Sequence, residues 1–210
     1  MVVDFTKITE LRPIFFLCDI QERFAKAMTN WDMVVDGTVM MLKVALELKA
    51  PVIVTEQYTK AFGPTVAPIR EVLDQFPEGL VHGPFEKKAF GMLTPPVRQA
   101  VAKLSHDGHN AAVICGIETQ VCVQQTTQRL HAEGLLDTFI PRDCVSSRFQ
   151  ADKDAALDFM RDLMRHRKEG EAEIFITTAE SLAFNLIGGA DHPSFKAISG
   201  LVKAERHREY

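Results

Sequence analysis

Apolar residues follow two alternating patterns along this chain. Short, almost continuous apolar runs, such as PIFFLCD at residues 13–19, are typical of strands buried on both faces of a parallel sheet. Between them lie longer segments, such as residues 31–49, in which apolar side chains recur at helical spacing and predict amphipathic helices. The pattern predicts strands at residues 13–19, 51–56, 111–115, 135–140 and 173–177, a weaker strand within 79–91, and helices at 31–49, 66–75, 95–104, 151–168 and from 179 onward.

Strands that alternate with helices indicate a parallel sheet with right-handed crossovers. We therefore predict the α/β class, as a three-layer αβα sandwich around a central, mainly parallel sheet of about six strands. A chain of 210 residues with 46% hydrophobic content can bury one sizeable core. No repeat, low-complexity tract or linker interrupts it, so residues 1–210 are expected to form a single domain.

The segment at residues 110–130, NAAVICGIETQVCVQQTTQRL, combines a strand, a turn and a predicted helix. The apolar run ends at Cys115, Gly116 interrupts it, and a helix is expected to open near Cys122 with Thr119 as its N-cap. Cys115 is expected to be a core residue, because cysteine is among the most often buried residue types. Cys122 would lie beside the unpaired N–H groups of a helix start, where the helix dipole favours a thiolate. It is a candidate nucleophile.

Two further candidates lie at other strand ends. Asp19 ends the first apolar run, and Lys87 follows the weak strand. Parallel strands end at one edge of the sheet, so Asp19, Lys87 and Cys122 can meet there as proton acceptor, fixed positive charge and nucleophile. Taken singly, Asp19 is better explained as a helix cap or a partner of Arg23, and Lys87 as a solvated surface lysine. Only their combination indicates a site.

Composition narrows the range of functions. The formal net charge of −4 gives no general attraction to nucleic acid or an anionic membrane, and the apolar runs are too short to cross a bilayer. The seven histidines lack zinc-site spacing, and neither GxGxxG nor a P-loop motif occurs. Four cysteines in 210 residues do not suggest a disulfide scaffold, and no secretory signal is evident, so a cytoplasmic location is expected.

Several motifs together carry a resemblance to a known family. CDIQERF, TEQY followed by GPT, KKAF at residues 87–90 and CGIETQVCV resemble the isochorismatase-like cysteine hydrolases, in particular the eukaryotic isochorismatase domain-containing proteins. The similarity continues through DCVSS and TTAESLAFNLIGGADHPSFK, and thus covers residues 12–203.

The resemblance implies roles for particular residues. Asp19 would be the general base, Lys87 the cation that orients Asp19 and stabilises the thiolate, and Cys122 the nucleophile. A cis peptide bond between Ile117 and Glu118 would direct the Glu118 amide, with that of Cys122, toward one oxyanion. The residues implied to line the substrate pocket are Phe24, Gln57 and Tyr58.

The chain departs from the metal-binding nicotinamidases of the superfamily. These carry Asp-x-His after the second strand, where this chain has Glu56, Gln57 and Tyr58, so neither zinc, iron nor another cofactor is expected. The resemblance implies a hydrolase that cleaves a small amide or related C–N bond through a thioacyl-enzyme, and a homo-oligomer. A non-catalytic oligomeric binding or regulatory protein that keeps the pocket is the alternative. A ribonuclease role is disfavoured because acidic residues outnumber basic ones, and the net negative charge would repel phosphate groups.

Overall fold

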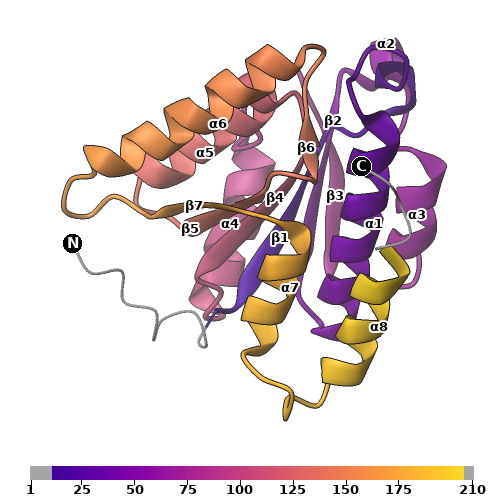
Figure 1. Ribbon diagram of the computed structural model, residues 1–210. Helices are drawn as coiled ribbons and strands as arrows, with labels where there is room; N and C mark the ends of the chain where they lie inside the picture. The colour runs from indigo at the N-terminus through magenta and orange to yellow at the C-terminus, as the bar shows by residue number, and fades with distance from the viewer. Residues whose placement is uncertain (1–10, 206–210) are drawn as a thin grey trace.

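A parallel sheet runs through the centre of the molecule, and helices cover both of its faces (Figure 1). The computed structural model describes residues 11–205. The seven-stranded sheet has the order β3-β2-β1-β4-β5-β7, β6 pairs with β4, and every ladder is parallel. The strands are β1 (Pro13–Cys18), β2 (Val52–Gln57), β3 (Val81–Lys87), β4 (Ala111–Ile117), β5 (Asp137–Pro141), β6 (Val145–Ser146) and β7 (Ile174–Thr177).

The helices form two outer layers, which confirms the predicted αβα class. Helices α1, α3, α7 and α8 pack on one face of the sheet, and α4, α5 and α6 on the other. None of the helices in residues 11–205 has both the length and the apolar character that a membrane crossing needs. The helices are α1 (Trp31–Glu47), α2 (Thr59–Phe62), α3 (Ala67–Leu73), α4 (Pro95–His106), α5 (Gln124–Ala132), α6 (Gln150–Arg165), α7 (Ala179–Ile187) and α8 (Phe195–Glu205).

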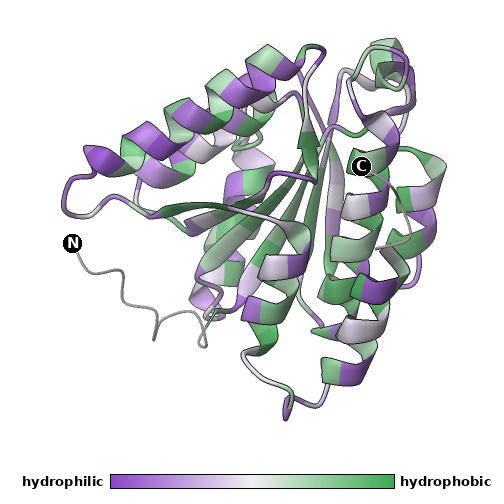
Figure 2. Cartoon of the chain, viewed as in Figure 1, coloured by the Kyte–Doolittle hydropathy of each residue, from purple (hydrophilic) through white to green (hydrophobic). Residues whose placement is uncertain are grey.

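Side chains of the central strands alternate between two apolar clusters, as the geometry of a strand requires. Phe15 and Leu17 of β1 belong to the cluster under α1, whereas Phe16 and Cys18 belong to the cluster under α4, α5 and α6. Figure 2 shows the result, with hydrophobic strands between helices that carry hydrophilic residues. Burial on both faces explains why these strands read as continuous apolar runs.

The start of the helix after β4 differs from the prediction. Gly116 does not end the strand, because β4 continues through it to Ile117. A π-helical turn, Thr119–Val123, precedes α5, and Glu118 rather than Thr119 occupies the N-cap position. Thr119 is therefore inside the first turn, where its hydroxyl is buried and has no hydrogen-bond partner among the described residues. The prediction of Thr119 as the cap was wrong, but Cys122 does lie in the first helical turn.

The sheet reverses its order at β1. The chain proceeds from β1 to β2 and β3 on one side, and then returns to place β4 on the other side of β1. Ligands of open α/β proteins bind at such a switch point, outside the carboxyl ends of the strands. Here β1 and β4 approach closely, because Gly116 pairs with Cys18 and a Cβ atom on Gly116 would lie 2.1 Å from the Cys18 carbonyl oxygen. Gly116 also has a φ of +144°.

Replacement of Gly116 by alanine should destabilise the fold by about 1–3 kcal/mol, because a methyl group has no space between these strands. Urea denaturation measures this change. Gly200→Ala is the matched control: a Cβ atom on Gly200 of α8 would meet nothing within 4 Å. That variant should be up to about 1 kcal/mol more stable, as alanine is in an exposed helix. Equal midpoints for the two variants would refute the close approach at Gly116.

Candidate active site

Asp19, Lys87 and Cys122 meet at the switch point. The Nζ atom of Lys87, the last residue of β3, lies 2.6 Å from Asp19 Oδ2 and 3.7 Å from Cys122 Sγ. Asp19 follows β1, and Cys122 comes from the π-helical turn after β4. All three residues are buried, with exposed fractions of 1%, 3% and 7% for Asp19, Lys87 and Cys122. The topology therefore brings an acid, an ammonium group and a thiol into one protected cluster.

Four oxygen atoms accept hydrogen bonds from the Lys87 ammonium group and fix its position. Besides Asp19, its ammonium group donates to Gln57 Oε1 at 2.7 Å, and to the carbonyl oxygens of Phe90 at 2.8 Å and Ala89 at 3.2 Å. Burial disfavours the ammonium form, but the nearby Cys18, Asp19 and Cys122 groups outweigh it, and the pKa of Lys87 is raised. Lys87 is therefore a permanent cation at neutral pH.

Asp19 has an unusual backbone conformation, and its carboxylate has three partners: Thr55, Lys87 and the Cys18 thiol, which lies 3.8 Å from Oδ2. Its φ of 54° lies in the left-handed region, which aspartate tolerates better than most residues. Oδ1 accepts a hydrogen bond of 2.8 Å from the Thr55 hydroxyl, and Oδ2 accepts the one from Lys87. Thr55 is the β2 residue that pairs with Cys18. Neighbouring strands β1 and β2 thus orient the carboxylate.

Cys18 is the residue of this cluster that the sequence did not reveal. Its Sγ atom, the Asp19 carboxylate and the Cys122 Sγ atom all lie within 4.8 Å of one another. Burial, then a hydrogen bond with Cys122 and the charge of Asp19, raise the pKa of the Cys18 thiol well above its usual value. Cys18 therefore remains a neutral thiol next to Cys122. Successive residues of a regular strand point to opposite faces, so alternation gave no reason to place Cys18 beside Asp19.

The same three groups have the spacing of possible metal ligands, but their surroundings do not suit a metal ion. Lys87 already places a positive charge 2.6 Å from the Asp19 carboxylate, and a divalent cation there would meet strong repulsion. Glu56 occupies the region where metal-binding relatives are expected to carry ligands. Its carboxylate accepts hydrogen bonds from the Thr65 amide at 2.6 Å and the Thr65 hydroxyl at 2.8 Å. Glu56 thus fixes the loop that contains Thr65, and its carboxylate is already occupied by these hydrogen bonds.

A cavity of about 380 Å³ opens beside Cys122. Phe24 and Gln57 line it. Phe24 stacks on Phe62, with ring centroids 4.5 Å apart. The cavity is also lined by residues that the sequence did not single out: Arg23, Ala27, Met28, Phe62, Phe90, Val121 and Arg148.

Tyr58 does not line this cavity, contrary to the role that the resemblance implies. Its φ of 34° is left-handed, so it does not continue the alternation of β2. The residue is 40% exposed, and the Lys88 ammonium lies 5.4 Å from its ring centroid. The pocket wall is instead completed by Phe62 of the short helix α2, which follows Tyr58.

The loop at the end of β4 contains the peptide bond expected to be cis. The Ile117–Glu118 bond is cis in the structure. Glu118 lines the pocket, and its carboxylate accepts hydrogen bonds from Arg148 Nε at 3.3 Å and from Gln120 at 3.1 Å. Gln120 in turn accepts a hydrogen bond of 2.6 Å from the Ser147 hydroxyl. The segment after β6 therefore supports the loop that precedes Cys122.

The fold and this cluster define an open α/β protein with an acid, a lysine and a cysteine at its switch point. The isochorismatase domain model matches residues 13–169, so the chain belongs to the isochorismatase family. This confirms the resemblance found in the sequence, and the family is one of hydrolases.

Three comparisons illustrate the relationship. Isochorismatase domain-containing protein 2 of Xenopus laevis is 34% identical over 93% of this chain and 86% of its own length. A structure described as MAR1 ribonuclease from Caenorhabditis elegans is 32% identical, with a TM-score of 0.78, over 91% of this chain and 90% of that one. The YcaC gene product of Escherichia coli, an octameric hydrolase of unknown specificity, is 17% identical with a TM-score of 0.72, over 93% and 91% of the two chains. The last shows likeness in fold alone.

Lys87→Met should destabilise the protein by about 3–5 kcal/mol, because it leaves the buried Asp19 carboxylate without its counter-ion. Asp19→Asn in the same chain should recover part of this loss, since the double variant contains no unpaired charge. Urea denaturation of the two single variants and the double variant gives the coupling free energy between Lys87 and Asp19. Lys88→Met is the control, because Lys88 is exposed, and its effect should stay within about 0.5 kcal/mol. Strictly additive effects would contradict the pairing of Lys87 with Asp19.

Proposed function

We propose that this protein is a metal-free cysteine hydrolase that cleaves a small amide or related C–N bond. The observation that carries the proposal is the buried contact of Lys87 with both Asp19 and Cys122 at the edge of a cavity. A thiol needs to lose its proton to act as a nucleophile, and a nearby cation favours the thiolate. Asp19, whose carboxylate lies within 4.8 Å of Cys122 Sγ, is the acceptor for that proton.

The proposed reaction has two halves. The Cys122 thiolate attacks the carbonyl carbon of the substrate, the C–N bond breaks, and the departing nitrogen takes the proton held by Asp19. The product of this half is a thioacyl-enzyme and a free amine or ammonia. Asp19 then accepts a proton from water, whose oxygen attacks the thioacyl carbon. The C–S bond breaks, a carboxylic acid leaves, and Cys122 regains its proton.

The negative charge that develops on the carbonyl oxygen needs hydrogen-bond donors. We assign this role to the backbone amides of Glu118 and Cys122. Cys122 lies in the first turn of a helical segment, where backbone N–H groups and the positive end of the dipole favour an anion. Preorganised donors of this kind supply a large share of catalysis in acyl transfer.

The cavity favours a small substrate with a planar or apolar body. Phe24, Phe62 and Phe90 supply aromatic walls, and Arg23 and Arg148 place positive charge at the same cavity. Its volume of about 380 Å³ lies within the usual range for small-molecule sites. A homo-oligomer is also part of the proposal, because the E. coli neighbour is described as octameric. The exposed Phe90 and Phe149 are apolar groups that a second copy would cover.

Cys122→Ala should abolish hydrolysis and leave the fold intact, because the sulfur is the nucleophile. Ammonia release from a panel of small primary amides measures the activity, and iodoacetamide followed by mass spectrometry should label Cys122 before the other cysteines. Cys115→Ala is the matched control. Cys115 is a buried cysteine of β4 that belongs to the apolar cluster on the opposite face of the sheet. Full activity of the Cys122 variant would exclude this mechanism, and an inert Cys122 thiol would favour the non-catalytic binding protein.

RNA hydrolysis is a second candidate function, because the C. elegans neighbour is described as a ribonuclease. Arg23 and Arg148 are the cavity residues that would contact a phosphate group. We expect no Cys122-dependent cleavage of single-stranded RNA at about 0.15 M salt, because the chain carries a net charge of −4. Cleavage by the parent chain that Cys122→Ala abolishes would replace amide hydrolysis as the activity of this site.

A further inference from the structure

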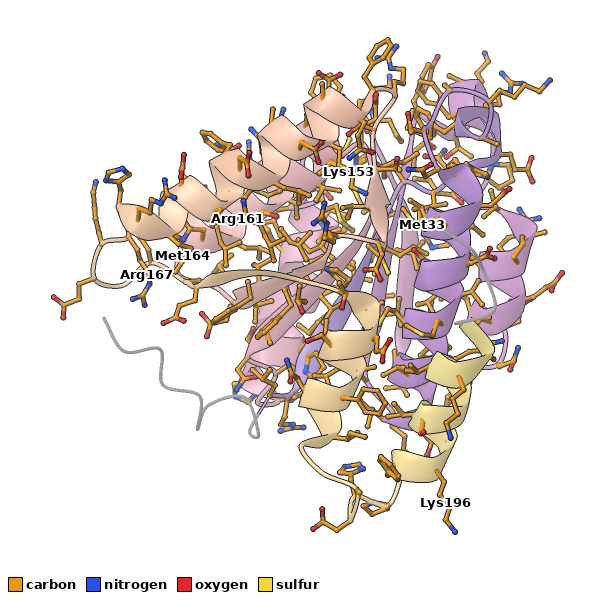
Figure 3. The ribbon with its side chains drawn as sticks, viewed as in Figure 1. Met33, Lys153, Arg161, Met164, Arg167 and Lys196 are labelled. Atoms are coloured by element: carbon orange, nitrogen blue, oxygen red, sulfur yellow. The ribbon has the colours of Figure 1, made fainter. Side chains whose placement is uncertain are left out.

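A second cavity, of about 430 Å³, lies near the same edge of the sheet and shares no lining residue with the cavity beside Cys122. Its walls come from the first half of α1, the β5–β6 turn, the first turns of α6 and α7, and Val202 of α8. Figure 3 labels two of the residues that line this cavity, Lys153 on α6 and Met33 on α1. The proposed hydrolysis uses none of these residues.

Lys153 is the unusual residue of this second cavity. It is only 4% exposed, yet its ammonium group forms neither a hydrogen bond nor an ion pair of 4 Å or less with any other residue in the described range 11–205. Lysine is almost never fully buried without a partner, because a desolvated ammonium group is costly. Burial and the like charge of Arg142, which also lines the cavity, lower the pKa of Lys153, and the nearby Asp143, Asp154 and Cys144 groups offset this only in part. Both effects would be reduced by an anion beside the ammonium group.

The carboxylates in the cavity wall meet this need only in part. Asp143 accepts hydrogen bonds from the Ala179 amide, with its two oxygens 2.8 and 3.2 Å from that nitrogen. The negative charge of Asp143 thus stabilises the N-terminus of α7, where unpaired amides and the helix dipole favour an anion. Glu180, the other carboxylate of the wall, also has an interaction of its own. Neither Lys153 nor Arg142 forms an ion pair of 4 Å or less within the described range, so both cations are available to a ligand in the cavity.

We propose that this second cavity binds a small organic carboxylate, with Lys153 and Arg142 as its counter-ions. The apolar body of the ligand would pack against Met33, Met40 and Val202, which line the cavity. A monoanion fits better than inorganic phosphate, because Asp143 and Glu180 would repel a second negative charge. The site is independent of the proposed hydrolysis.

Binding is tested with hexanoate as the probe, in a full-length Cys122→Ala background that removes the catalytic sulfur. Isothermal titration and thermal unfolding should show that hexanoate binds and raises Tm, whereas uncharged hexanamide and inorganic phosphate do not. Lys153→Met should weaken the hexanoate Kd by about tenfold or more, as expected for the loss of a charge-assisted hydrogen bond. Lys196→Met, which removes an exposed lysine of α8, should leave the Kd unchanged.

Several results would overturn the site. These are no hexanoate binding, equal binding of hexanamide, phosphate binding in place of hexanoate, or an unchanged Kd in Lys153→Met. Methionine matches the lysine stem in size and removes a buried charge, so this variant should fold. If it does not, Arg142→Gln at an exposed position provides the second measurement, with the same expected loss of affinity and the same refuting result.

Discussion

The buried ion pair between Lys87 and Asp19 is the interaction on which the rest of the site depends. Both side chains are at most 1% exposed, and the desolvation of each charge costs several kcal/mol unless partners offset it. Here the offset is nearly complete, because Thr55 donates to Asp19, and Gln57 and two backbone carbonyls accept from Lys87. These contacts link the ends of β1, β2 and β3. A thiol placed next to this linkage meets a cation that is already fixed in position.

Sheet topology determines where the thiol arrives. The order of the strands reverses between β1 and β4, so the loop after β4 must begin beside Asp19. Gly116 permits this approach, because any side chain there would collide with Cys18. The π-helical turn that follows places Cys122 within reach of Lys87. Every catalytic role proposed for this site therefore depends on the close approach of β1 and β4 at Gly116.

The sequence predicts those parts of the protein that depend on burial and periodicity. The runs of β1 and β4, the main helices and the edge shared by Asp19, Lys87 and Cys122 follow from such patterns. The two residues of β6 are too short to produce a pattern, and β3 is weakened by Gly83 and Pro84 at the edge of the sheet. Strand alternation predicts neither the closeness of Cys18 to Asp19 nor the position of Tyr58 outside the cavity, because Asp19 and Tyr58 are left-handed residues that break it.

The two buried lysines at this edge of the sheet, Lys87 and Lys153, differ in how many hydrogen-bond acceptors the protein provides for their ammonium groups. Lys87 donates hydrogen bonds to four oxygen atoms of the protein. Its ammonium group is therefore fully hydrogen-bonded without a ligand and remains a fixed cation of the proposed reaction site. Lys153 is buried to nearly the same extent but has no such acceptors among the described residues. Lys153 lines its cavity, whereas Lys87 lies behind Gln57 and Cys122, which line the other cavity. The two lysines therefore have different roles. Lys87 acts on neighbouring groups of the protein, whereas Lys153 is the counter-ion that we propose for an anion in the second cavity.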